Sequence, residues 1–516
     1  MLYSSDPAWG MRGALKKYYD IHPADFIKRV DREGVWLART PTTALKHPEK
    51  FGIVFHQHSS VKTSTLHYDN ASGIYAFLYD QPCRITLPLG TGRKPSGAAV
   101  VKRLEEAAAN PDDEQHENAV LIRRVAARVS RTARSKYGYY FHIRNQGWRG
   151  FTALFEGNFD PDLPYFPEKG MNRLEDWWSN AEADVMGVRE GLYSGVYIDS
   201  SESFVESINL NREHFKYADL PLVWDANSGK VGVITAQSTY EYLRATADLL
   251  HSRGKLFMAN YTPIRHGYFA TVFDVLGIEV YILPEERELL CAKRLSEQNG
   301  EIRLKEVGFT EKELKKTRKT AEQGIEIPYN LHSWRTEDLA YYRRAMCYQK
   351  PYNYLIKIAG RKDFALLGMD GLCEYLNWCL FFGIYPGCPE GFVVEQERVE
   401  DVFARYTPVM KAIGSAGWEP VTHALSDSPD IRIERFGYGP QDSLHFTVRN
   451  FGSKTQETTV AIDAAALKLP QDVEVRDAFT GEFRPSERLD KALKFQLELE
   501  PAETVVVKVV KAIFPQ

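Results

Sequence analysis

The chain has 516 residues and a formal net charge of −4, with 44% hydrophobic and 26% charged residues. This composition is typical of a soluble globular protein with two or three domains. The lack of a basic excess argues against a nucleic-acid partner, and no apolar run reaches the roughly 18 residues that a membrane-spanning helix needs.

Taken in chain order, the first part of the sequence alternates helical and strand patterns. Helices are expected at residues 8–32 and 172–190, and strands at residues 52–55, 73–79, 139–143 and 195–198. The second helix is bounded by Asn172, a good amino-terminal cap, and by Gly191, a good carboxyl-terminal stop. It leads directly into the strand that ends at Asp199.

The alternation continues to about residue 400. Strands are expected at residues 255–259, 273–279, 352–358 and 381–385, and helices at 238–253, 335–348, 363–378 and 398–414. Residues 284–330 are charged and helical, which is typical of an insertion over a strand end. About eight repeats of strand and helix predict a (β/α)8 barrel, with a doubly wound open sheet as the alternative. Neither GxGxxG nor a P-loop occurs, which disfavours a nucleotide-binding open sheet.

After residue 417 the pattern changes to short alternating strands separated by Gly, Pro, Asn and Asp. These strands are expected at residues 431–436, 443–450, 457–462, 473–477, 493–499 and 504–511. They predict an antiparallel β-sandwich. The expected division is therefore a helical lead-in at 1–50, a barrel at 51–415 containing the insertion 284–330, and a sandwich at 420–516.

Two carboxylates stand out at strand ends, where an α/β barrel places its active site. Counting the strand that opens at Gly52 as the first, Asp199 ends strand four and Glu279 ends strand six. Glycoside hydrolysis needs such a pair, one to attack the anomeric carbon and one to protonate the leaving oxygen. Alternatives remain for each residue: Asp199 could cap a helix, Glu279 could face outward, and Asp274 is then the reserve acid.

The stretch Gly195-Val196-Tyr197-Ile198-Asp199, the acid on strand six and the trailing sandwich resemble retaining glycoside hydrolases of the α-galactosidase, α-glucosidase and dextranase type. The resemblance implies that Asp199 is the nucleophile and Glu279 the acid/base, although many of these families use Asp there. It also implies an α-linked oligo- or polysaccharide as the substrate, and no cofactor. Such enzymes often carry another sandwich ahead of the barrel, so a longer parent protein is also consistent with this chain.

Further residues near strand ends are candidates for substrate binding. They are His56, Trp224, Asp225, Asn260, Tyr261, Arg265 and Lys357. Aromatic rings at such places can stack on sugars, and polar groups can hydrogen-bond to hydroxyls. For Trp224 and Asp225, which precede Asn227-Ser228-Gly229, an ordinary Asx turn is an equal alternative.

His56-Gln57-His58 favours a rival function, because an HxH at the end of the first barrel strand resembles the metal site of amidohydrolases. That family also needs His residues on strands five and six and an Asp on strand eight, and this chain lacks them. The six cysteines show no CxxC spacing, which indicates free thiols rather than a zinc site. We therefore expect no metal and keep two alternatives, the metal-dependent barrel and a non-catalytic glycan-binding protein.

Residues 1–6 contain neither the basic nor the apolar region of a signal peptide. A cytoplasmic protein and a trimmed periplasmic or secreted one both remain possible, and the oligomeric state is not predicted.

Overall fold

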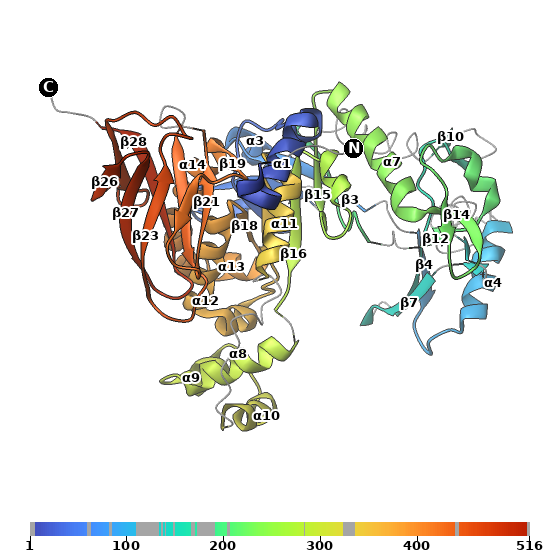
Figure 1. Ribbon diagram of the computed structural model, residues 1–516. Helices are drawn as coiled ribbons and strands as arrows, with labels where there is room; N and C mark the ends of the chain where they lie inside the picture. The colour runs from blue at the N-terminus through green and yellow to red at the C-terminus, as the bar shows by residue number, and fades with distance from the viewer. Residues whose placement is uncertain are drawn as a thin grey trace. The chain divides into compact units, whose positions relative to one another are not determined.

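The computed structural model describes residues 6–58, 63–81, 85–109, 134–135, 138–139, 141–147, 150–166, 171–172, 191–203, 207–282, 284–322, 336–438 and 443–512. The chain folds as two compact units, Met1–Phe77 with Asp274–Gln516, and Leu78–Phe273 (Figure 1). Among the described residues, none of the helices combines the length and the apolarity needed to cross a bilayer. The expected helix at 172–190 falls outside the described residues, apart from Asn172.

The described strands include a closed parallel barrel. Its members are β1 (Val35–Ala38), β2 (Ile53–His58), β3 (Tyr75–Asp80), β11 (Gly195–Ile198), β15 (Leu256–Asn260), β16 (Val275–Val280), β17 (Tyr352–Ile356) and β18 (Tyr385–Cys388). They are hydrogen-bonded in the order β1-β18-β17-β16-β15-β11-β3-β2. The pairs β1–β2, β1–β18, β16–β17, β17–β18 and β11–β15 are all parallel. The predicted barrel is therefore confirmed.

One barrel strand is missed and one expected barrel strand is wrong, so the number of strands is unchanged. The sequence does not predict β1, whose four residues are all buried and so lack an alternating pattern. The strand expected at 139–143 corresponds to β7 (Phe141–Asn145), which belongs to the separate antiparallel sheet β4-β8-β7. Asp199 still follows the fourth barrel strand and Glu279 lies on the sixth.

The last barrel strand begins later than expected. Phe381 and Phe382 complete helix α12 (Arg361–Phe382), and the strand β18 starts at Tyr385. Gly383, in the left-handed conformation with φ of 63°, ends the helix. The aromatic run was misleading because a buried helix end and a buried strand have the same composition.

The position of the Trp36 side chain on β1 shows which face of each neighbouring barrel strand points into the barrel. This side chain is fully buried, and a Cβ placed on Gly277 of β16 would lie 3.1 Å from its ring. Because β1 and β16 are separated by β17 and β18, the ring reaches Gly277 through the barrel interior. Side chains alternate along a strand, so Glu279 also faces inward.

The other helices of the first unit lie before, between and after these strands along the chain. They are α1 (Gly10–Ile21), α2 (Pro48–Phe51), α3 (Thr63–Ala71), α8 (Pro284–Ser296), α9 (Gly300–Glu306), α10 (Glu311–Glu322), α11 (Glu337–Cys347), α13 (Glu390–Val394) and α14 (Gln396–Ala416). Short 3-10 helices span Pro7–Trp9, Pro23–Phe26 and Thr42–Ala44.

The second unit adds smaller elements to β11 and β15. They include β4 (Ile85–Gly90), α4 (Gly97–Ala109), β8 (Phe151–Phe155), β12 (Ile208–Asn209), β13 (Val223–Asp225), β14 (Lys230–Ile234) and α7 (Thr235–Ser252). Short pieces at Arg134–Ser135, Gly138–Tyr139, Pro164–Phe166 and Met171–Asn172 form two-stranded sheets. Leu87, Val100, Leu104 and Phe155 are part of an apolar cluster that joins α4 to the sheet β4-β8-β7.

The predicted sandwich is confirmed as two antiparallel sheets, drawn in orange to red in Figure 1. Its strands are β19 (Trp418–Glu419), β20 (Ala424–Ser426), β21 (Ile431–Phe436), β22 (Leu444–Asn450), β23 (Gln456–Asp463), β24 (Val473–Asp477), β25 (Phe483–Arg484), β26 (Ser486–Leu489), β27 (Ala492–Leu499) and β28 (Thr504–Lys511). Alternate residues of β23 and β27 are buried, among them Val460, Ile462, Phe495 and Leu497. This period of two is what the sequence showed.

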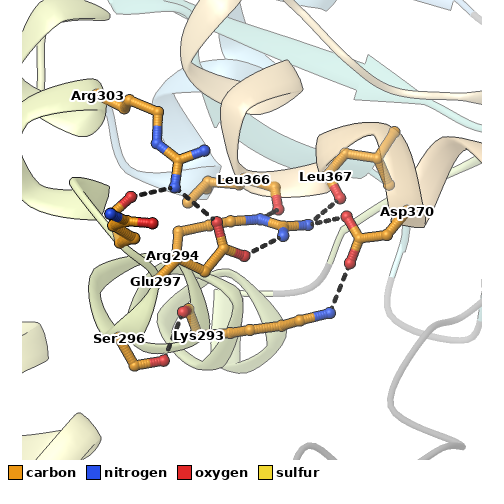
Figure 2. A network of polar contacts seen from close by, with 9 residues as sticks. Lys293, Arg294, Ser296, Glu297, Arg303, Leu366, Leu367 and Asp370 are labelled. Carbon is orange, nitrogen blue, oxygen red and sulfur yellow. Dashed lines mark hydrogen bonds and ion pairs between the residues drawn. The ribbon is translucent and has the colours of Figure 1, made fainter.

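The helices α8, α9 and α10 occupy the expected insertion, and Arg294 of α8 attaches it to α12 (Figure 2). Helix α12 breaks at Gly368, where φ is 70° and ψ is 176°, a conformation largely restricted to glycine. The Arg294 guanidinium donates to the carbonyls of Leu366 and Leu367 at the break and to Asp370 beyond it, at 2.6 Å. A Cβ on Gly368 would lie 2.3 Å from Arg294 Nη2, so glycine is also required by space.

Arg294→Met is therefore expected to lower the free energy of unfolding by about 3 kcal/mol, because it leaves two buried carbonyls without their donor. Lys293→Met is the matched control, because Lys293 binds the other oxygen of Asp370 at 2.6 Å but both side chains are nearly half exposed. Exposed pairs contribute about 0.5 kcal/mol. Denaturant unfolding of the two variants measures the difference, and equal losses would contradict this account of the break.

Candidate functional site

Asp199 follows β11 and accepts hydrogen bonds from the ends of two other strands. The Tyr79 hydroxyl donates to Oδ2 at 2.7 Å, and Gln81 Nε2 approaches the same oxygen at 3.3 Å. Asn260 Nδ2, at the end of β15, donates to Oδ1 at 2.9 Å. All of these residues belong to the second unit. Both carboxylate oxygens are thus oriented, while the side chain remains partly exposed.

Local sequence explains why Asp199 sits where it does. Gly195 opens β11 so close to β15 that a Cβ there would lie 1.9 Å from the carbonyl oxygen of Leu256. The Asp199 amide donates to the carbonyl of Asp80 at 2.9 Å, which aligns the ends of β11 and β3. Ser200 then turns the chain with φ of 59°, and the carboxylate is left at the strand end.

The hydrogen bonds of Asp199 hold both of its carboxylate oxygens in a fixed orientation. A nucleophilic carboxylate needs such an orientation, together with access to the reacting carbon, and the side chain is partly exposed. The arrangement therefore suits nucleophilic or electrostatic chemistry.

The end of β15 and the segment after it carry three of the residues expected to bind substrate. Asn260 contacts Asp199 as described, and Tyr261 bends the backbone with φ of 69°. Arg265 is exposed, and its Nη2 donates to the carbonyl of Glu202 at 3.4 Å. The structure thus brings Asn260 to Asp199 and gives Arg265 a partner in the preceding loop.

Glu279 forms a second polar group with the expected residue Lys357, within the first unit. Lys357 Nζ lies 2.6 Å from Oε1 of Glu279, and the Tyr281 hydroxyl donates to Oε2 at 2.9 Å. The Lys357 amide also donates to the carbonyl of Val280 at 2.8 Å, which joins the ends of β16 and β17. Glu279 and Lys357 thus form an ion pair at the adjoining ends of β16 and β17.

The reserve acid Asp274 lies at the wrong end of its strand for catalysis. It directly precedes β16, whereas barrel active sites form at the carboxyl ends. Its side chain is fully buried and paired with Arg29 at 3.2 Å. Lys350 is also nearby: burial lowers the pKa of Lys350 to about 8, and the Asp274 charge opposes this shift. We assign Asp274 a structural role, as a buried ion-pair partner at the amino-terminal end of β16.

His56 and His58 face the helices rather than the barrel interior. Phe55 pairs with Trp36, which points inward, so its neighbour His56 lies on the opposite face. His56 Nδ1 and His58 Nε2 lie 2.6 and 2.8 Å from the same oxygen of Asp69, on α3. The resemblance to amidohydrolases requires the two histidines to end the first barrel strand and to point inward. Here they lie on the second barrel strand and point outward.

Buried His56, His58 and Asp69 have atoms that could bind a metal, all within 4.8 Å of one another. Burial alone would raise the pKa of Asp69, but hydrogen bonds from both histidines and Thr42 bring it below its usual value. Burial lowers the pKa of His58, although the bond to Asp69 acts in the opposite direction. The cluster therefore connects β2 to α3 through hydrogen bonds, and it needs no metal to satisfy Asp69.

We expect dialysis against EDTA, and later addition of Zn²⁺, to leave the melting temperature unchanged within about 1 °C. A metal bound at a hundred times its Kd would stabilise the fold by about 2.7 kcal/mol, which is several degrees for most domains. Asp69→Asn serves as the control for zinc bound elsewhere. A melting temperature that falls with EDTA and recovers with zinc only when Asp69 is present would contradict the hydrogen-bonded interpretation.

Trp224 and Asp225 lie on the hairpin β13–β14 of the second unit. Trp224 is 65% exposed and pairs with Val231, which is 46% exposed. Asp225 Oδ1 accepts from the Asn227 amide at 3.0 Å, the geometry of an Asx turn. No described contact joins either side chain to Asp199, and their role in substrate binding stays a prediction.

The structure also shows polar partners that the sequence did not suggest. Tyr79 and Gln81 lie on both sides of Asp80, the strand end that could be recognised, but their contact with Asp199 depends on the pairing of β3 with β11. The Glu202 carboxylate binds backbone amides of the segment after β15.

No family model matches the chain, and no curated protein matches it. Among solved structures, similar ones include a noncanonic maltogenic alpha-amylase, AmyB from Thermotoga neapolitana, with a TM-score of 0.43 and 8% identity over 93% of this chain and 99% of that one. The alpha-amylase from H. orenii gives 0.43 and 8% over 93% and 100%. A Nostoc punctiforme debranching enzyme gives 0.41 and 11% over 92% and 97%. These scores are low, and the function proposed below rests on the residues of this chain.

Proposed function

We propose that this protein is a glycoside hydrolase that uses Asp199 as its nucleophile. The observation that carries the proposal is the carboxylate at the end of β11, oriented by Tyr79 and Asn260 at 2.7 and 2.9 Å. The side chain is also partly exposed, so the oriented carboxylate is accessible to a substrate at the strand end, where barrels carry their active sites. The resemblance of Gly195–Asp199 to the nucleophile strand of retaining glycosidases supports the same role.

In the proposed reaction, an oxygen of Asp199 attacks the anomeric carbon while an acid gives its proton to the departing glycosidic oxygen. The resulting glycosyl ester is then hydrolysed by water, with the same acid now acting as base, so the anomeric configuration is retained. Tyr79 and Asn260 hold the carboxylate at its two oxygens. They also stabilise the carboxylate when it leaves in the second step.

Glu279 is the proposed acid/base. It faces the barrel interior near the carboxyl end of β16, the end of a strand at which parallel barrels carry their catalytic groups. Glu279 has to donate a proton in the first step, so the proposal requires its ion pair with Lys357 to loosen when substrate binds.

An α-linked glycan is the proposed substrate class, from the resemblance of the nucleophile strand. The test is turnover by wild-type protein on a panel of aryl α- and β-glycosides and of polysaccharides. We expect hydrolysis of at least one α-glycoside with a first product of retained configuration by NMR. An inverted product would contradict Asp199 as nucleophile, and glycan binding without any turnover would replace hydrolysis by the non-catalytic alternative.

A further inference from the structure

The loops that follow β11 and β15 are joined to each other by hydrogen bonds. Ser201 donates to the carbonyl of Asn260 twice, from its amide at 3.1 Å and from its hydroxyl at 2.8 Å. Asn260 in turn donates to Asp199 at 2.9 Å. Ser201 is fully buried. The backbone and the side chain of Asn260 are thus both fixed by the loop that carries Asp199.

Glu202 adds further hydrogen bonds between the loop after β11 and the loop after β15. Its Oε1 accepts from the Thr262 hydroxyl and the Ile264 amide, both at 2.8 Å. Its Oε2 accepts from the amides of Arg265 and His266 at 2.8 and 3.1 Å. The Glu202 side chain is fully buried. The four donors thus satisfy both oxygens of the buried carboxylate.

We propose that Glu202 is a positioning residue for Asp199, acting through the loop that presents Asn260. The inference rests on the proposed function, because positioning has meaning only for a nucleophile. Glu202 is buried and so cannot touch substrate, yet it binds the backbone within six residues of Asn260. Tyr261, between them, has a φ of 69° that non-glycine residues seldom adopt. The carboxylate therefore holds a bend that would otherwise relax and carry Asn260 away from Asp199.

The variant that tests this is Glu202→Gln, which keeps the size of the side chain. Its amide nitrogen would face backbone donors in place of one acceptor oxygen. With the 4-nitrophenyl glycoside that wild type hydrolyses fastest, we expect kcat to fall about 100-fold, the loss that a displacement of about 1 Å can cause. We expect KM to change less than about threefold, because Glu202 does not contact substrate. Hydrogen exchange is expected to speed up at the amides of Ile264, Arg265 and His266.

Two control variants separate positioning from a general loss of stability. Thr262→Val removes one donor and leaves the three backbone amides on Glu202, so we expect a fall in kcat of only a few fold. Arg294→Met destabilises the insertion, which lies in the other unit, and we expect its kcat to match wild type at a temperature where both are folded. Circular dichroism verifies folding before each assay.

The outcomes distinguish this inference from the proposed function. Faster exchange at residues 264–266 with an unchanged kcat would overturn positioning while leaving Asp199 as the nucleophile. Unchanged exchange would also overturn it, because the loop would not depend on Glu202. If wild type hydrolyses no glycoside while exchange still responds to Glu202→Gln, the proposed function fails, and the positioning role fails with it.

Discussion

Replacing Asp199 with alanine is expected to lower kcat/KM on the best aryl glycoside roughly a thousandfold or more, about 4 kcal/mol of transition-state stabilisation. The variant removes the atom proposed to form the glycosyl ester, and no neighbouring donor can replace it, because Tyr79, Gln81 and Asn260 supply no carboxylate. Initial rates over a range of substrate concentrations measure the loss. Asp219→Ala, which removes an exposed carboxylate from the same unit, is expected to retain full activity.

Azide gives Asp199→Ala a second, chemical readout. The small anion can enter the space left by the carboxylate and attack the anomeric carbon of a glycoside with a good leaving group, as an external nucleophile. We expect the rate to rise with azide and the product to be a glycosyl azide of inverted configuration. An Asp199→Ala variant with nearly wild-type turnover would exclude the nucleophile assignment.

Glu279→Gln is expected to show the second large effect, and the effect should depend on the leaving group. The amide cannot protonate the glycosidic oxygen, so natural glycans and aryl glycosides of high leaving-group pKa should lose roughly a thousandfold in kcat/KM. A dinitrophenyl leaving group needs little protonation and is expected to keep most of its rate of glycosylation. The ratio of kcat/KM between wild type and Glu279→Gln, determined for each of the two substrates, measures this contrast.

Lys357→Met provides the companion experiment, because Lys357 is the cation 2.6 Å from Glu279. The variant removes the contact that holds Oε1 of Glu279, so we expect a loss of about tenfold in kcat/KM on the glycoside of high leaving-group pKa and little loss on the dinitrophenyl glycoside. Equal activity of Glu279→Gln on both leaving groups, or a loss in Lys357→Met that is the same on both, would place the acid elsewhere.

The sandwich and most of the barrel could be predicted because their patterns reflect burial directly. In β23 and β27 one face is buried and the other is not, so the alternation is visible in the sequence. In β1 all four residues from Val35 to Ala38 are buried, and a short apolar run carries no periodicity. In α12 the buried Phe381 and Phe382 look like a strand for the same reason.

From the sequence, only those site residues could be predicted that stand at the end of a recognisable strand. Asp199 and Asn260 end neighbouring strands, so each could be recognised alone. Tyr79 and Gln81 reach Asp199 across more than a hundred residues of chain, and Glu202 reaches Ile264 across sixty-two. The direction of His56 depended on a pairing with β1, a strand that the pattern did not show.

The most direct test of the central claim is to trap the glycosyl ester that Asp199 is proposed to form. Wild-type protein would be incubated with a fluorinated aryl glycoside that forms the intermediate quickly and hydrolyses it slowly, then digested and mapped by mass spectrometry. We expect one sugar per chain, attached within the peptide that contains Asp199, and no label in Asp199→Ala. A label on a different carboxylate, or turnover of the parent substrate with no covalent adduct, would contradict the account.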